Sequence, residues 1–150
     1  MGTHYRGTAA EEQALNVFIK FTRAYDTVSS HLLRSLKSLG LTMSQLGVLE
    51  ALLHLGPMCQ RQMGDKLLMS RANMTTVVDN LERDGYVQRI RSKEDRRLLL
   101  LHLTEKGEEL IRSVFPQHLA EITRLMNALT PEEQEQYAKL SKKLGMGNQE

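Results

Sequence analysis

The chain has 150 residues, of which 41% are hydrophobic and 25% charged, a composition typical of a folded protein with a single domain. No apolar run approaches the roughly 20 residues that cross a bilayer, and the N-terminus lacks the pattern of a secretory signal. We therefore expect a cytoplasmic protein with no membrane partner. The lone cysteine, Cys59, excludes an internal disulfide framework, and the net charge of +2 excludes a polycation.

The first ten residues show no periodic pattern, and we expect them to be unstructured. Residues 11–39 contain neither proline nor glycine, and their apolar residues recur every three or four positions, which predicts one long amphipathic helix. Gly40 is typical of the position just after a helix. A helix of this length measures roughly 40 Å, which is more than a small core needs. Part of it should pack on a second copy of the chain.

Two shorter helices are predicted next. Thr42 is a good N-cap, and Gln45 three positions later completes a capping box. This second helix should end at Gly56, and a third should open at Cys59 or Gln60.

A fourth helix is predicted from its N-cap, Ser70, to about Asp84. Together with the third helix it makes a helix-turn-helix candidate. If Met74, Val78 and Leu81 face the core, small and polar side chains on the opposite face can approach base edges and phosphates. That face carries Ala72, Asn73, Thr75, Thr76, Asp79 and Arg83. An ordinary solvated helix face is the alternative.

Residues 86–101 have the pattern of a β-hairpin, because two apolar segments flank a highly charged turn. Five basic residues crowd the turn and its edges: Arg89, Arg91, Lys93, Arg96 and Arg97. Over residues 60–97, nine basic residues outnumber six acidic ones, so this segment carries +3 and the rest of the chain −1. A cationic finger of this kind suits insertion beside nucleic-acid phosphates.

Two helices are predicted to follow the hairpin. Thr104 is the N-cap of a long one with an apolar stripe. The second starts at Thr130, which is followed by proline at the first helical position and by an acidic residue, Glu133, at the third. It should end near Gly145.

This order of elements resembles the MarR family of bacterial transcriptional regulators over about residues 11–144. The resemblance is carried by residues 70–87, by the wing signature Asp95-Arg96-Arg97, and by Leu103-Thr104-Glu105-Lys106-Gly107. It implies a mainly α fold with a small β-hairpin wing (α+β) within a single domain of residues 1–150. Residues 42–103 would form a winged helix-turn-helix lobe, and residues 11–39 and 104–145 the dimerisation helices.

The resemblance also implies a homodimer that binds double-stranded DNA at a pseudo-palindromic operator, with the fourth helix in the major groove. Arg97 is expected to enter the minor groove, and Asp95 to orient an arginine unless it is only a turn former. Arg89 is a further phosphate candidate. Many relatives carry arginine in place of Thr76, so base reading would rest on smaller side chains here. The expected DNA-contacting residues are Ser70, Arg71, Asn73, Thr75, Thr76, Arg91, Lys93, Asp95, Arg96 and Arg97.

Regulation is implied as well: a repressor relieved by a small phenolic or lipophilic ligand or by thiol modification. A ligand cleft could be lined by Phe18, Thr22, Tyr25 and His31, although aromatic residues at helical spacing are also typical of a core. Cys59 at a helix start could be a redox sensor, because a helix N-terminus stabilises thiolate. A structural, half-buried cysteine is the alternative.

Motifs of catalysis and metal binding are absent from the sequence, which has no phosphate-binding glycine loop, no His-Glu-x-x-His and no Cys-x-x-Cys. The five histidines lack ligand spacing. We expect no enzyme activity, no cofactor and no metal. The alternative function is a winged-helix protein-interaction module that does not bind DNA, which the missing arginine at Thr76 favours.

Overall fold

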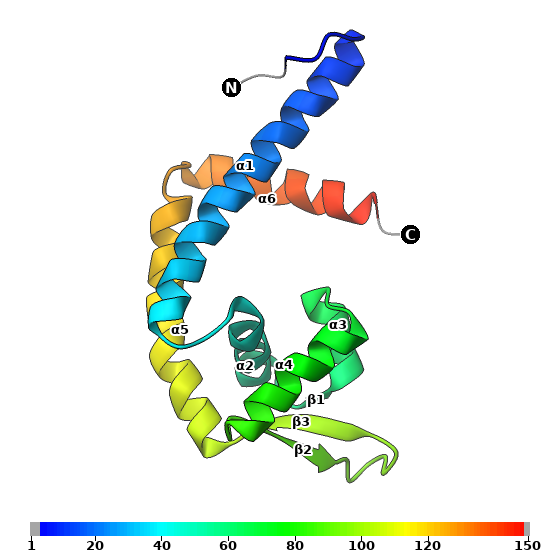
Figure 1. Ribbon diagram of the computed structural model, residues 1–150, viewed down its shortest axis with the longest axis vertical. Coiled ribbons are helices and arrows are strands. Elements are labelled where there is room, and N and C mark those ends of the chain that lie inside the picture. Colours follow the sequence, from blue (N-terminus) through cyan, green and yellow to red (C-terminus); the bar gives the residue numbers. More distant parts are fainter. Residues whose placement is uncertain (1–3, 149–150) are drawn as a thin grey trace.

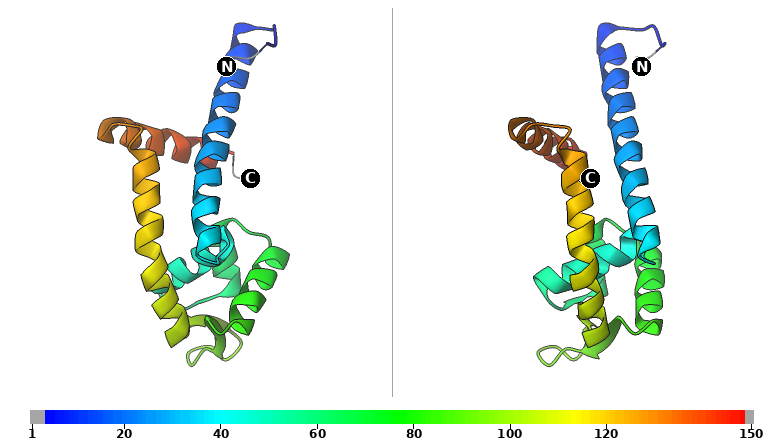
Figure 2. Two further views of the ribbon diagram at one scale, coloured as in Figure 1. Left: turned by 60° about the vertical axis from the view of Figure 1, so that its left-hand side comes forward. Right: turned by 90° about the vertical axis from the view of Figure 1, so that its left-hand side faces the viewer.

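The computed structural model describes residues 4–148, so our expectation for the first three residues lies outside it. Two long helices, α1 and α5, extend side by side from a lobe that holds the short helices and a small sheet, and α6 turns back from the far end of α5 and crosses α1 near its middle (Figures 1 and 2). In chain order the elements are α1 (Ala9–Ser38), α2 (Met43–Leu55), β1 (Met58–Cys59), α3 (Gln60–Leu67), α4 (Arg71–Arg83), β2 (Val87–Arg91), β3 (Leu99–Leu103), α5 (Glu105–Met126) and α6 (Pro131–Met146).

Helix α1 begins at Ala9, two residues before the predicted start, so the expectation of an unstructured segment up to residue 10 is wrong at its end. A capping box explains the earlier start. The hydroxyl of Thr8 accepts from the backbone N–H of Glu11, and the Glu11 carboxylate accepts from the backbone N–H of Thr8. The carboxylate also accepts from the Thr8 hydroxyl at 2.9 Å, and the two bonds that it accepts, the backbone one first, lower the pKa of Glu11.

The helix-turn-helix forms where the sequence predicts it. The capping box of Thr42 and Gln45 opens α2, and Gly56 ends it with φ of +81°. Leu68, at φ +52°, makes the left-handed turn between α3 and α4, and the hydroxyl of Ser70 caps α4. Helix α4 therefore starts from a fixed turn.

The wing hairpin consists of β2 and β3, and it belongs to a three-stranded antiparallel sheet of order β1-β3-β2. Strand β1 was not predicted. It pairs Met58 with Leu101 and Cys59 with Leu100, on the edge of β3 away from β2. This pairing attaches the hairpin to the segment that leads into α3, so the wing is anchored at the start of the helix-turn-helix.

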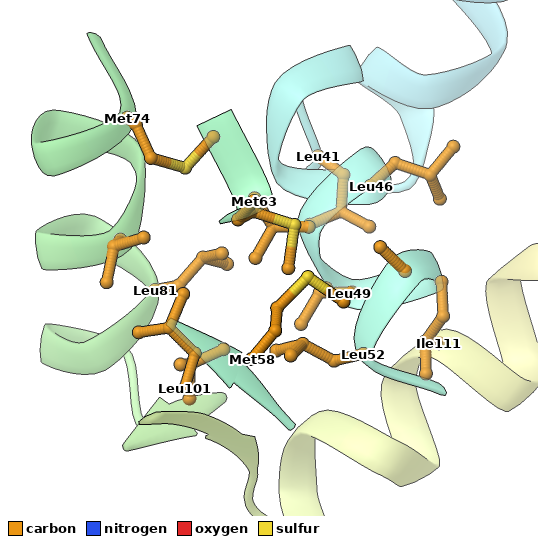
Figure 3. Close-up of a cluster of buried hydrophobic side chains, with 14 of the residues drawn as sticks. Leu41, Leu46, Leu49, Leu52, Met58, Met63, Met74, Leu81, Leu101 and Ile111 are labelled. Carbon is orange, nitrogen blue, oxygen red and sulfur yellow. The ribbon is translucent and has the colours of Figure 1, made fainter. Parts of the chain in front are cut away.

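One hydrophobic core holds the lobe together (Figure 3). Leu49 of α2, Met63 of α3 and Leu101 of β3 meet the buried face of α4, and each is under 2% exposed. Ile111 brings the first half of α5 into the same cluster. Because Met74 and Leu81 of α4 are buried on this side, the opposite face of α4 points outward.

Helices α1 and α6 bury little within the chain. Leu36 is the buried residue of α1, and the described part of α6 has none. Large apolar side chains stand exposed along both helices: Val17, Phe18, Phe21, Tyr25, Leu33, Tyr137, Leu140, Leu144 and Met146. Within residues 4–148, no helix combines the length and the apolar character needed to span a membrane.

Candidate nucleic-acid interface

The outward face of α4 presents short polar side chains and Arg83. Asn73 and Thr76 are exposed there, and Arg71 is exposed in the first turn of the same helix. The Ser70 hydroxyl is already occupied, since it accepts the backbone N–H of Asn73 at 3.2 Å. The helix start can therefore approach DNA through its backbone N–H groups, while the three exposed side chains remain available to base edges.

Thr75 lies differently from the expectation. It is half-buried, and its hydroxyl accepts a 2.7 Å hydrogen bond from Nε2 of Gln60 on α3 while donating to the carbonyl of Arg71 at 2.9 Å. Thr75 therefore lies against the neighbouring helix and does not belong to the free outer face. Thr75 follows the buried Met74 in the sequence, about 100° round the helix. In the structure this side of α4 contacts α3.

The tip of the wing is organised by Asp95. Its carboxylate accepts from Nε and Nη2 of Arg97 at 3.0 and 2.9 Å, and from the backbone N–H of Arg97 at 3.0 Å. These bonds from the Arg97 side chain, and then from its backbone, lower the pKa of Asp95. The Arg97 side chain nevertheless stays 89% exposed. The expected contact between the two residues is present, and it holds a charged guanidinium out in solvent.

The other cations of the wing fall into two groups. Lys93 and Arg96 are exposed near the tip. Arg91 is also exposed, but its Nη1 donates to the carbonyl of Arg96 at 2.6 Å and so braces the loop. Arg89 departs from the prediction of a phosphate contact, because its guanidinium is bonded to carboxylates of α4 and its side chain is only 22% exposed.

Known proteins share this arrangement. Residues 41–99 match the family model of MarR. The chain is 38% identical to YkoM of Bacillus subtilis, named an uncharacterized HTH-type transcriptional regulator, over 92% of this chain and 90% of that protein. It is 36% identical to the HTH-type transcriptional regulator MhqR of the same organism, over 90% and 93%.

The chain belongs to the MarR family. Its fold matches the crystal structure of the MarR-family regulator Sco3205 from Streptomyces coelicolor in complex with DNA, with a TM-score of 0.85 and 25% identity over 99% of this chain and 94% of that one. The predicted winged helix-turn-helix is thus confirmed. MarR proteins are DNA-binding transcriptional regulators and not enzymes, so the same holds for this chain.

Cys59 of this MarR-family chain lies where the wing meets the helix-turn-helix. The residue is half-buried and its thiol is free. It precedes α3 as the N-cap residue, its backbone N–H donates to Oε1 of Gln62 at 3.0 Å, and it pairs with Leu100 of β3. A modified Cys59 would therefore lie at the junction of the sheet and α3.

The predicted ligand cleft on the first helix is not enclosed within this chain. Phe18 and Tyr25 are 60% and 65% exposed. The hydroxyl of Thr22 donates to backbone carbonyls of its own helix, and His31 contacts Arg34 at 3.1 Å. The helical spacing of these four residues shows that they share one face of the helix. It does not show whether that face lines a cleft or forms the outer surface.

A pocket of about 460 Å³ lies instead between α2, the end of α3 and α5. It is lined by Met43, Ser44, Leu46, Gly47, Glu50, Leu67, Met69, Phe115, His118 and Ile122. His118 is 6% exposed, and its Nδ1 has no hydrogen-bond partner within the described residues. Burial lowers the pKa of His118, partly offset by the charge of Glu50. The wall thus combines an apolar surface with a neutral imidazole and a carboxylate.

Metal ligands do not gather in this fold. Across residues 4–148, no three side chains of His, Cys, Asp or Glu lie together as a metal ion would require.

Proposed function

We propose that this chain is a homodimeric repressor that binds a pseudo-palindromic operator in the cytoplasm and is released by a small effector or by modification of its thiol. The observation that carries the proposal is the wing tip. Arg97 is held by Asp95 yet 89% exposed, on the same lobe as the outward face of α4. A guanidinium presented in this way suits the narrow, negative minor groove beside a major groove that holds α4.

The exposed apolar faces support the homodimer. A groove of about 560 Å³ runs between α1 and α6, lined by Val17, Lys20, Phe21, Ala24, Tyr137, Leu140, Ser141 and Leu144. An apolar groove of this kind marks an interface. A second copy that covers α1, α5 and α6 about a two-fold axis would present two α4 helices, and half-sites one DNA turn apart would match them.

The DNA contacts follow from exposure. We assign Arg71, Asn73 and Thr76 to base edges, where asparagine suits adenine and the threonine methyl suits thymine. Ser70 would place the α4 N-terminus against a phosphate. Lys93 and Arg96 would contact phosphates, with Arg91 bracing the loop and Asp95 orienting Arg97.

Selection of genomic fragments, followed by gel shifts over a salt series, tests operator binding. Displacement of phosphate counterions should make the affinity fall steeply as salt rises. The selected fragments should share a palindrome with half-sites about 10 base pairs apart. Absence of a common site, or binding that ignores salt, would favour the winged-helix protein-interaction module instead.

The pocket between the lobe and α5 is the site we propose for the effector. An occupant there would alter the distance between a dimerisation helix and the DNA-binding lobe, and so favour another spacing of the two α4 helices. Among the described residues that line it there is no lysine or arginine, while Glu50 and His118 supply acceptors. This lining favours an uncharged phenol over a carboxylate. 4-tert-Butylphenol should therefore release operator DNA at concentrations where 4-tert-butylbenzoate does not, and equal release by both would contradict the assignment.

Cys59 offers a second route to release. Alkylation or oxidation of its thiol would push β1 away from β3 and disturb the start of α3. N-Ethylmaleimide should weaken operator binding by the native chain but not by Cys59→Ser. If the native chain keeps its affinity after complete alkylation, this cysteine has no sensing role.

A further inference from the structure

Arg89 joins three elements of the DNA-binding lobe. From the middle of β2, its Nη2 donates to Oδ1 of Asp79 at 2.6 Å and its Nη1 donates to Oε1 of Glu82 at 2.8 Å. Its backbone N–H donates to the other oxygen of Glu82 at 3.0 Å. A further bond of 3.2 Å runs from Nη2 to Oε1 of Gln60 on α3. One side chain thus connects the wing to both helices of the helix-turn-helix.

The two acidic partners of Arg89 would be unfavourable on a helix that faces DNA if they were unpaired. The side chains of Asp79 and Glu82 are 58% and 41% exposed, and Asp79 lies on the outward face of α4. An unpaired carboxylate there would repel the phosphates on either side of the major groove. The guanidinium of Arg89 compensates one of these two negative charges, and its two terminal nitrogens bond one to each carboxylate. Burial alone would lower the pKa of Arg89, but the hydrogen bonds and charges of the two carboxylates outweigh it and raise the pKa, so the guanidinium stays charged.

The same contacts also fix geometry. Arg89 is opposite Leu101, which is 1% exposed, so the backbone at this point of β2 is attached to the core. Gln60 accepts from Arg89 through one end of its amide and donates to Thr75 through the other. A guanidinium held on several sides resists bending of the wing relative to α4, because each bond has a defined direction.

We propose that Arg89 is the internal counterion and positioning residue of the DNA-binding surface. It masks two carboxylates on the recognition helix and holds the wing at a fixed distance from that helix, without touching DNA itself. Through Gln60 it also keeps Thr75 against α3, which leaves sequence reading to Arg71, Asn73 and Thr76. The inference rests on the proposed operator binding.

A mutant cycle separates this role from a direct phosphate contact. Arg89→Gln is made in the native chain and in the Asp79→Asn/Glu82→Gln background, and operator affinity is measured by fluorescence anisotropy with the full-length dimer. An internal counterion predicts a loss of about tenfold in the native background and of roughly threefold or less in the neutral one. The same loss in both backgrounds would overturn the proposal, because a phosphate contact does not depend on these carboxylates.

A second readout needs no DNA. Amide hydrogen exchange over residues 87–103 should speed up in Arg89→Gln, while Arg124→Gln, which breaks the exposed Arg124–Glu121 pair on α5, should leave it unchanged. Unchanged exchange in Arg89→Gln would overturn the positioning role. If the native dimer fails to bind any operator, the proposed function falls and the counterion role falls with it. If the native dimer binds and the cycle shows no coupling, only this inference falls.

Discussion

Gly107 is a position at which one added methyl group should lower the stability of the fold strongly. It lies in the first turn of α5, and a Cβ added there would stand 2.0 Å from the carbonyl oxygen and 2.9 Å from the carbonyl carbon of Tyr86. The helix start is held against this strand entry by Thr104. The backbone N–H of Thr104 donates to Tyr86 O at 3.1 Å and its hydroxyl donates to Gly85 O at 2.6 Å. The close approach is therefore between backbones, and neither side can rotate away.

The cost of Gly107→Ala follows from that distance. A carbon and a carbonyl oxygen approach no closer than about 3.3 Å, so α5 must move away from Tyr86 by about 1 Å. Overpacking costs about 1–3 kcal/mol, and weakening the two Thr104 bonds adds about 1–2 kcal/mol. Alanine returns about 1 kcal/mol through its helix propensity. The expected net loss is about 1–4 kcal/mol of the free energy of unfolding.

Urea unfolding followed by circular dichroism measures this loss, at one protein concentration for all variants because a dimer's stability depends on concentration. Gly145→Ala is the matched control, since nothing lies within 4 Å of its added Cβ and α6 gains the same propensity. It should be as stable as the native chain or slightly more so. Native stability in Gly107→Ala would refute the reasoning that this contact is rigid.

Three further predictions concern the interface, the pocket and the dimer. Arg97→Ala should weaken operator binding and lower the slope of log K against log salt by about one; an unchanged slope would show that Arg97 meets no phosphate. Burial lowers the pKa of His118, so the unfolded chain binds its proton more readily. The stability that neutral His118 contributes should be fully present above the ordinary histidine pKa and be lost as the pH falls from there through the lowered pKa of the folded state; His118→Gln should flatten the pH dependence of the urea midpoint, and identical curves would contradict this. Leu140→Asp should give monomers in sedimentation, whereas Leu68→Asp, a residue 85% exposed on the α3–α4 turn, should stay dimeric; a dimeric Leu140→Asp would place the interface elsewhere.

The starts of α2, α4, α5 and α6 could be predicted because each has a local cause. Thr42, Ser70, Thr104 and Thr130 all cap helices through their own hydroxyls, as the sequence predicts. The charged turn of the wing is likewise local, and so is the pairing of Asp95 with an arginine two residues away. Such contacts join neighbours in the chain, and one sequence contains both partners.

Contacts between distant residues could not be predicted in the same way. Strand β1 has two residues, too few for a periodic signal. Gln60 and Arg89 are 29 positions apart, and nothing in the spacing indicates their bond. The sequence did contain one sign of this contact. Asp79 and Glu82 are two acidic residues three positions apart on a helix expected to bind DNA, and such a pair implies a cation nearby. The pocket had no comparable sign, because its lining comes from three segments that lie far apart in the sequence.

Helix α5 runs without interruption for 22 residues, from the foot of the wing to the turn before α6 (Figure 1). That makes it a lever about 33 Å long. A tilt of about 10° at one end would sweep the other through about 6 Å, half the width of a major groove. A slight adjustment where two subunits meet would thus be magnified into a misfit at the operator, with no rearrangement inside the lobe.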